Sequence, residues 1–345
     1  MLASQGYVTV SIRVNGINAQ DFALLDGGAD ARAKIVQRHL DYWAGIASVR
    51  KVDLDRVVLV GHSRGGEGVD RAAIQIPLDA PYRIAGQVLL APTDFASHAA
   101  PYIPTVTMLP YCDGDVSDLQ GQRFTDTGRD VFSDDTALKS SVLVMGANHN
   151  FFNTEWTPGI SVAPSFDDWF GPKRQTCGKR TPERLTATEQ QSVGTAYVAG
   201  AVDLFTRGTP DFLPLFDGTA ASVESIGDAD ARSHALGGGW ELRRPGVDSV
   251  LSPSDGARTQ LCDGVSTFGR KPALCGRRTE PGSTPHWPDR GESGVPTRKF
   301  LEVDWNASGQ SGGLTLNEGL DLRGKRLTLR TIVDPAYERV GLRVR

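Results

Sequence analysis

The sequence lacks a long apolar run, a large excess of charge of either sign and any closely spaced pair of cysteines. No apolar stretch approaches the roughly 18 residues that a membrane-spanning helix needs, so we expect no membrane span. The 37 Lys and Arg residues nearly balance the 41 Asp and Glu residues, and the formal net charge of -4 gives no electrostatic reason to expect nucleic acid as a partner. The start of the chain, Met1 to Gly6, has neither the basic nor the apolar region of a signal peptide.

The chain has few cysteines, and their spacing argues against a metal site. Cys112, Cys177, Cys262 and Cys275 form no C-x-x-C pair, and their even number and wide separation suit two disulfides better. Three pairings are open, and the domain order favours Cys112 with Cys177 and Cys262 with Cys275; four free thiols are the alternative. Two disulfides would point to an oxidising compartment.

The most informative stretch that is present covers residues 57–67, with the sequence VVLVGHSRGGE. A β-branched apolar run ends in G-x-S-x-G and passes directly into a helical pattern, which is typical of a nucleophile elbow. Such a turn lifts a serine hydroxyl clear of the sheet so that a base can reach it. The pattern predicts Ser63 as the nucleophile, and we expect Gly61 and Gly65 to be required because side chains there would collide as the chain reverses.

Strands and helices alternate along the first part of the chain. This order predicts a mostly parallel sheet covered on both faces, in a catalytic domain over residues 1–214. Strands are expected at 7–12, 56–60, 84–90, 106–109 and 141–145, with helices at 31–46 and 66–76 and a long helix that begins at the capping box of Thr186 and Glu189.

The pattern changes after Pro214 to short alternating runs separated by Gly, Ser and Asp. Apolar residues alternate with polar ones at 301–305, 327–330 and 340–344, which is typical of antiparallel strands. We therefore expect residues 215–345 to form an accessory β-sandwich of jelly-roll type.

A serine elbow needs a base and an acid from loops that follow later strands, in the chain order Ser, Asp, His. His149 follows the 141–145 strand, where the base should lie, whereas His234 and His286 fall in the expected β region. The best candidate acid is Asp115, in the turn after the 106–109 strand. The other candidates are Asp113, Asp118 and Asp94; a calcium loop starting at Asp113 is disfavoured because Phe124 stands where its bidentate Glu would be.

The neighbours of Ser63 have their own expected roles. The backbone N–H of Arg64 would donate to the oxyanion of the reaction, as the residue after the nucleophile does. We expect the Arg64 side chain to pair with Glu67 or to face solvent. His62 is interpreted as a packing residue rather than a second base.

These motifs resemble the α/β-hydrolase superfamily over roughly residues 1–210. The closest likeness is to secreted bacterial esterases with a chlorophyllase-like or platelet-activating-factor-acetylhydrolase-like core, in which G-H-S-x-G-G, a D-G-D acid loop and a G-x-x-H base loop occur in this order. The resemblance implies a serine esterase without metal or organic cofactor, acting on a small-molecule or polymeric ester. It says little about residues 215–345.

The chain departs from that family at both ends. The 7–12 stretch resembles the family's fourth strand, but the earlier strand that supplies the second oxyanion donor has no counterpart, and 340–345 is a strand pattern without a closing turn. We therefore expect the chain to be a piece of a longer extracellular precursor, incomplete at both ends and poorly active by itself.

An aromatic stretch follows the base directly. Phe151, Phe152 and Trp156 are candidates for an acyl or alcohol pocket, and a Cys112–Cys177 disulfide would tie this stretch to the acid loop. The alternative is that these rings only pack the loop down.

Two rival functions remain open. One is a serine peptidase that uses the same triad. The other is a non-catalytic protein with an inert hydrolase half, whose β region binds carbohydrate or a cell surface through Trp240, Trp287 or Trp305.

Overall fold

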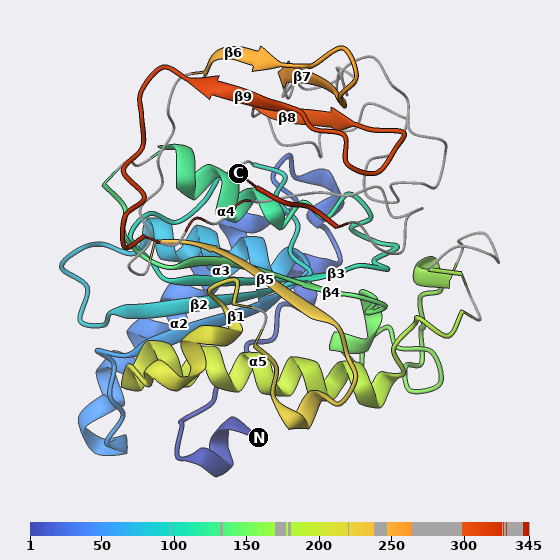
Figure 1. The fold of residues 1–345 in the computed structure, drawn as a ribbon. Helices are drawn as coiled ribbons and strands as arrows, with labels where there is room; N and C mark the ends of the chain where they lie inside the picture. The colour runs from blue at the N-terminus through green and yellow to red at the C-terminus, as the bar shows by residue number, and fades with distance from the viewer. Residues whose placement is uncertain are drawn as a thin grey trace. The chain divides into compact units, whose positions relative to one another are not determined.

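Residues 57–236 contain a five-stranded sheet whose strands follow each other in sequence order (Figure 1). The computed structural model describes residues 1–96, 98–131, 134–169, 177–178, 181–219, 221–237, 247–263, 299–325, 327, 329 and 341–344. The strands are β1 (Val57–His62), β2 (Ile84–Leu90), β3 (Thr105–Pro110), β4 (Lys139–Val144) and β5 (Ala231–Leu236). The first four are parallel and β5 is antiparallel to β4, so the mostly parallel sheet predicted from the sequence is confirmed.

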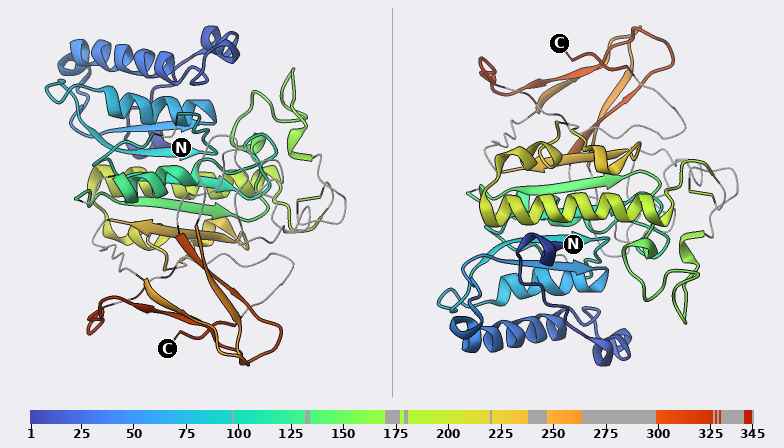
Figure 2. Two further views of the ribbon diagram at one scale, coloured as in Figure 1. Left: turned by 90° about the horizontal axis from the view of Figure 1, so that it is seen from above. Right: turned by 90° about the horizontal axis from the view of Figure 1, so that it is seen from below.

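Helices cover both faces of this sheet. Figure 2 shows α5 along one face and α3 and α4 on the other. The α-helices are α1 (Asn15–Asn18), α2 (Ala29–Arg50), α3 (Arg64–Gln75), α4 (Gln122–Val131) and α5 (Ala187–Arg207). The short 3-10 helices are η1 (Leu2–Gln5), η2 (Asp21–Ala23), η3 (Asn150–Phe152), η4 (Asp167–Trp169), η5 (Pro210–Leu215) and η6 (Glu224–Ile226).

Successive residues of a strand point to opposite faces, and this alternation divides the core in two. Val88 of β2 packs in one cluster with Val193 and Tyr197 of α5. Its neighbour Leu89 packs in the other cluster with Val69 of α3 and Val36 of α2. The parallel sheet is thereby buried on both sides, as its nearly continuous apolar sequence requires.

The longest amphipathic helices begin and end close to their sequence signals. The capping box is confirmed at the start of α5, where Thr186 Oγ1 accepts from the Glu189 N–H and the Glu189 side chain accepts from the Thr186 N–H. The helix ends before Gly208, whose φ of 69° lies in the left-handed region that favours glycine.

The strand predicted over residues 7–12 is wrong, because this stretch has no regular secondary structure. Tyr7 is anchored to the end of α5 instead: its hydroxyl donates to Asp203 Oδ1 at 2.9 Å, and its ring lies under the guanidinium of Arg207. Val8 and Val10 are exposed, so the alternating pattern here does not reflect a buried sheet face.

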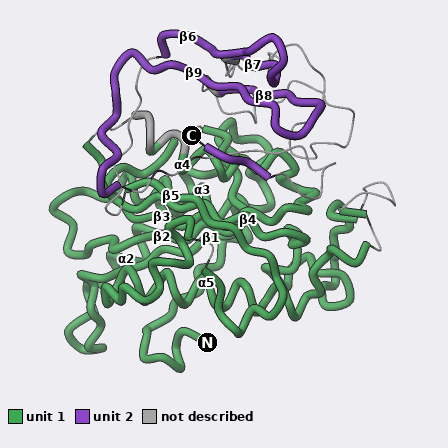
Figure 3. Tube along the Cα trace, in the orientation of Figure 1, with its two compact units in different colours: residues 1–241 green, residues 242–345 purple. Residues whose placement is uncertain are grey.

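The chain divides into two compact units at a later point than residue 214 (Figure 3). Unit 1 covers residues 1–241. It extends past residue 214 because β5, which lies in the region expected to form the β-sandwich, pairs with β4 of the first sheet. Unit 2 covers residues 242–345 and contains two antiparallel pairs among its described residues, β6 (Val247–Leu251) with β9 (Gly313–Leu316) and β7 (Arg258–Asp263) with β8 (Lys299–Asp304). The described residues of the other two expected runs, 327, 329 and 341–344, lie outside strands.

Candidate active site

Ser63 lies at a sharp junction between β1 and α3. Its backbone has φ 56° and ψ -130°, a conformation that side-chain-bearing residues rarely adopt and that costs on the order of 1–3 kcal/mol. The surrounding backbone holds it there, since the Ser63 N–H donates to the Leu90 carbonyl at 2.9 Å and the Ser63 carbonyl accepts from the Gly66 N–H at 2.8 Å. This is the strand, turn and helix order that the sequence predicted around the serine.

The glycines of the motif are not equally constrained. A Cβ on Gly61 would lie 2.2 Å from the Gly65 carbonyl oxygen, and one on Gly66 would lie 2.6 Å from Cβ of Pro92. A Cβ on Gly65 would meet nothing within 4 Å. The expectation that Gly65 is sterically required is therefore wrong, and the tight approach involves Gly61 and Gly66.

His149 is fully buried in the base loop, residues 145–149, which follows β4. Its Nδ1 lies 2.9 Å from Oδ2 of Asp113, in the acid loop, residues 111–118, which follows β3. The other oxygen of the Asp113 carboxylate accepts from the N–H groups of Asp115 and Val116, at 3.0 and 2.6 Å. Asp113 is thus fixed by its own turn and presents one oxygen to the imidazole.

Asp115 approaches the other nitrogen of the same ring. Its Oδ2 lies 3.1 Å from His149 Nε2, and its side chain is 44% exposed, whereas that of Asp113 is fully buried. Within the described residues Nε2 makes no hydrogen bond. The sequence pattern predicts Asp115 as the acid that orients the imidazole. In the structure Asp113 meets Nδ1 of the ring, and Asp115 meets Nε2 on the opposite side.

His62 connects the elbow to the base loop. His62 directly precedes Ser63 in the chain. Its Nε2 lies 3.1 Å from the His149 carbonyl oxygen, and the centroids of the two imidazole rings lie 4.5 Å apart. Burial, together with the charge of His149, lowers the pKa of His62 to about 3, so this ring is neutral at ordinary pH. These contacts support its interpretation as a packing residue.

The electrostatic surroundings of His149 favour its protonated form. Burial by itself lowers the pKa of an imidazole, but the carboxylates, first Asp113 and then Asp115 and Asp168, raise the pKa of His149 to about 9. In this arrangement the imidazole is charged near neutral pH. It becomes a proton acceptor only when the charges around Nε2 change or the pH rises.

The Arg64 side chain is held differently from the expectation. Its guanidinium donates to Asp21 of η2, whose other oxygen pairs with Arg32 at 2.5 Å. Glu67 is buried and accepts from the Thr93 hydroxyl at 2.8 Å instead. The Asp21 pairing fixes the first residue of α3, whose backbone N–H we expected to serve the oxyanion.

The predicted pocket aromatics lie around the two histidines. The Trp156 ring is stacked near His149 with centroids 6.5 Å apart, and Phe152 lies 6.5 Å from His62. Phe152 also packs against the core beside α5, and Phe151 contacts Trp169 at 5.6 Å. Trp156 thus neighbours the base, while Phe151 and Phe152 also serve to pack their loop.

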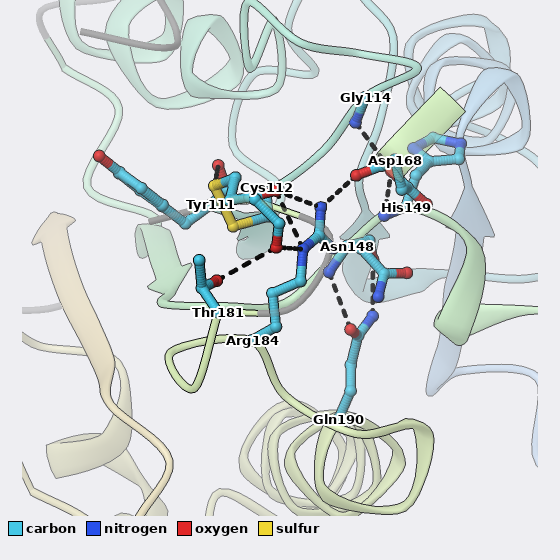
Figure 4. Close-up of a disulfide and its surroundings, with 11 residues drawn as sticks. Tyr111, Cys112, Gly114, Asn148, His149, Asp168, Thr181, Arg184 and Gln190 are labelled. Atoms are coloured by element: carbon cyan, nitrogen blue, oxygen red, sulfur yellow. Dashed lines mark hydrogen bonds between the residues drawn. A yellow bond between two sulfur atoms is a disulfide. The ribbon is translucent and has the colours of Figure 1, made fainter. Parts of the chain in front are cut away.

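The disulfide predicted between Cys112 and Cys177 is confirmed, with its Cα atoms 5.2 Å apart (Figure 4). It joins the acid loop to the chain beyond the aromatic stretch. The predicted pairing of Cys262 with Cys275 falls outside the part of the chain whose side chains the structure describes. The candidates His286, Trp240 and Trp287 also fall outside it.

The structure describes four further candidates from the sequence. Asp94 is buried near Arg123, 3.9 Å away, and His234 lies on β5 opposite Ser141 of β4. Asp118 is half-buried in the acid loop, and Trp305 of unit 2 is 43% exposed.

The described residues also show no cluster of three or more His, Cys, Asp or Glu side chains suited to a metal ion. None of the helices in that part of the chain combines the length and apolar character needed to cross a membrane. A hollow of about 390 Å³ lies beside α5, lined in part by Met1, Phe212 and Leu215, and is separate from the residues of the candidate site.

No protein-family model and no curated protein matches this chain.

Proposed function

We propose that this protein is a serine hydrolase that cleaves carboxylic esters through an acyl-enzyme, built on an α/β-hydrolase type of core. Ser63 is the nucleophile, His149 the base and Asp113 the orienting acid, in place of the Asp115 chosen from the sequence. The proposal needs no metal or organic cofactor. It includes an extracellular location, which the disulfide in unit 1 supports.

The observation that carries the proposal is the strained Ser63 backbone at the carboxyl end of β1. A non-glycine residue with φ 56° needs a compensating reason, and placing a nucleophile at a strand-to-helix turn is one. The contacts between His62 and His149 support it, because they bring the base loop against the residue that precedes the serine.

The choice of acid follows from which nitrogen each carboxylate meets. A base that accepts a proton at Nε2 must hold its other proton on Nδ1, and a buried carboxylate there fixes that tautomer and stabilises the imidazolium that forms. Asp113 meets these conditions, being fully buried and 2.9 Å from Nδ1. Asp115 lies where the serine hydroxyl and the leaving group would approach Nε2.

The reaction would begin with neutral His149. Its Nε2 takes the Ser63 proton as Oγ bonds to the ester carbon, and the oxyanion accepts from the Arg64 N–H. The imidazolium then gives its proton to the departing alkoxide, and the C–O bond of the ester breaks. Water then loses a proton to the same nitrogen as its oxygen bonds to the acyl carbon. The imidazolium returns that proton to Ser63 Oγ as the C–Oγ bond of the acyl-enzyme breaks and the carboxylic acid leaves.

A fluorophosphonate probe tests this function directly, because it labels only serines that are activated as nucleophiles. We expect labelling of the wild-type chain and none of Ser63→Ala or His149→Ala, with Ser4→Ala, an exposed serine of η1, as the control that still labels. The proposal would be overturned if wild type and Ser63→Ala were labelled equally, or if wild type and the variants all remained unlabelled. Among labelled proteins, hydrolysis of a short-chain p-nitrophenyl ester but not of a peptide anilide separates an esterase from a peptidase.

A further inference from the structure

The acid loop and the base loop are joined by a carboxylate that the catalytic scheme does not use. Asp168, in η4, is 3% exposed and accepts hydrogen bonds from three backbone N–H groups. Two donors are Gly114 of the acid loop at 2.7 Å and His149 of the base loop at 3.1 Å (Figure 4). The third is Asn150 at 3.0 Å. One side chain therefore fixes the backbone on both sides of the Asp113–His149 contact.

The approach of this segment to the acid loop is close. A Cβ on Gly114 would lie 2.3 Å from the Asp167 carbonyl oxygen and 2.6 Å from Cα of Asp168. Gly114 is thus required by the backbone that passes over it. The central glycine of the D-G-D sequence makes room for the segment that carries Asp168.

Asp168 is itself anchored from a third direction. The Arg184 guanidinium donates to the carbonyl oxygen of Asp168 and, through Nη2 at 2.8 Å, to that of Cys177. Cys177 is bonded to Cys112, the residue before Asp113. These contacts form a closed ring. It runs from Asp113 through the disulfide and Arg184 to Asp168, and from there through His149 back to Asp113.

We infer that Asp168 is the positioning residue of this site: it sets the distance and angle between Asp113 and the His149 imidazole by holding both loops. The inference rests on the proposed function. Burying a carboxylate is costly unless its oxygens are satisfied, and here three N–H donors satisfy them. The same three N–H groups would lose their acceptor if the carboxylate were removed, so both loops would relax together.

Asp168 also acts on the charge of the base. The titratable groups that face His149 within the described chain are Asp113 and Asp115 from the acid loop, Asp168 from η4 and His62 from β1. Removing the Asp168 charge therefore lowers the pKa of His149, whereas a merely structural defect would lower the rate without moving that pKa.

Asp168→Asn tests the inference, with Asp167→Asn as the matched control. The control removes the same charge from the adjacent residue, whose Oδ1 accepts from the Asn150 side chain at 3.2 Å and from the Asp168 N–H at 3.0 Å. Neither bond is one of the three that the Asp168 carboxylate accepts. At a pH above the pKa of His149, where the base is neutral in both proteins, we expect Asp168→Asn to lower kcat by about 10-fold to 100-fold with KM nearly unchanged, because small displacements of a base have effects of this size. The midpoint of the pH profile should move to lower pH, and the control should resemble wild type in both respects.

A second measurement separates this inference from the proposed function. The NMR titration of the His149 imidazole needs no activity, and we expect its midpoint to fall in Asp168→Asn but not in Asp167→Asn. If fluorophosphonate fails to label wild type while the NMR midpoint also shifts in a folded Asp168→Glu protein, which keeps the charge, the hydrolase proposal fails and the positioning role stands.

Equal kcat and equal His149 midpoints in the two variants would overturn the inference. Should Asp168→Asn show no cooperative thermal transition, Asp168→Glu keeps the charge and displaces the carboxylate by one methylene. A folded Asp168→Glu protein with wild-type kcat would also contradict the inference, because the three N–H contacts could not all be kept.

Discussion

Asp115 Oδ2 lies 3.1 Å from Nε2 of His149, the nitrogen that must receive the Ser63 proton in the proposed reaction. The carboxylate stabilises the imidazolium and occupies the space that the hydroxyl and the leaving group need. Because its side chain is 44% exposed, it can turn into solvent when an ester binds, unlike the buried Asp113. Both aspartates of the D-G-D sequence raise the pKa of His149, but they lie on opposite sides of its ring, Asp113 at Nδ1 and Asp115 at Nε2.

Asp115→Asn should shift the pH profile of ester hydrolysis to lower pH. The base acts when neutral, so activity rises as pH passes through the pKa of His149, about 9 with all its carboxylates present. Removing one negative charge lowers that pKa, and each unit increases the neutral fraction at pH 7 about tenfold. The measurement is kcat/KM from pH 5 to 10. Asp79→Asn, at an exposed position before β2, is the control. If the midpoint of the pH profile were the same in Asp115→Asn and wild type, this account of Asp115 would be refuted.

Asp113→Asn should have the opposite effect on the rate. The amide cannot hold the required tautomer or stabilise the imidazolium, and loss of an orienting acid lowers kcat by about 10⁴ in the well-known serine triads. The contrast with Asp115→Asn, measured on the same ester and at the same pH, decides which aspartate is the acid. A larger loss in Asp115→Asn than in Asp113→Asn would restore the assignment made from the sequence.

Gly61→Ala and Gly65→Ala form a matched pair on the two glycines of G-x-S-x-G. The Cβ at position 61 would lie 2.2 Å from a backbone oxygen, so we expect a distorted elbow and loss of fluorophosphonate labelling. Position 65 lies within α3 and has open space, and alanine there should preserve labelling while raising stability by about 0.5–1 kcal/mol. Thermal unfolding and labelling rates of both variants provide the test, and equal losses would contradict the steric argument.

The parallel sheet could be predicted because its signals are local. The strand at 84–90 is found where the apolar run predicts it, and the capping box at Thr186 marks the start of α5. The stretch at 7–12 has a similar local pattern but a different outcome, because the contacts of Tyr7 with Asp203 and Arg207 are long-range. Alternation alone does not reveal which partner a segment finds.

The candidate site could be predicted in part for the same reason. Ser63 and His149 follow strands directly, so the order of strands brings their loops to one edge. The choice between Asp113 and Asp115 depends on the turn inside the acid loop, in which Asp113 accepts two N–H groups, and the sequence does not specify that turn. Asp168 has no local signal at all, since its partners Gly114 and His149 lie 54 and 19 residues away.

Removing the disulfide should lower stability and activity together. Cys112 and Cys177 are 65 residues apart, and closing a loop of this length stabilises a fold by about 2–4 kcal/mol through the entropy of the unfolded chain. We expect Cys112→Ala with Cys177→Ala to reduce the free energy of unfolding in urea by that amount. Because Cys112 precedes Asp113 and the Cys177 carbonyl accepts from Arg184, kcat should also fall in the folded double variant, below the unfolding transition. A double variant with reduced stability but wild-type kcat would show that the bridge stabilises the fold without holding the acid loop in place.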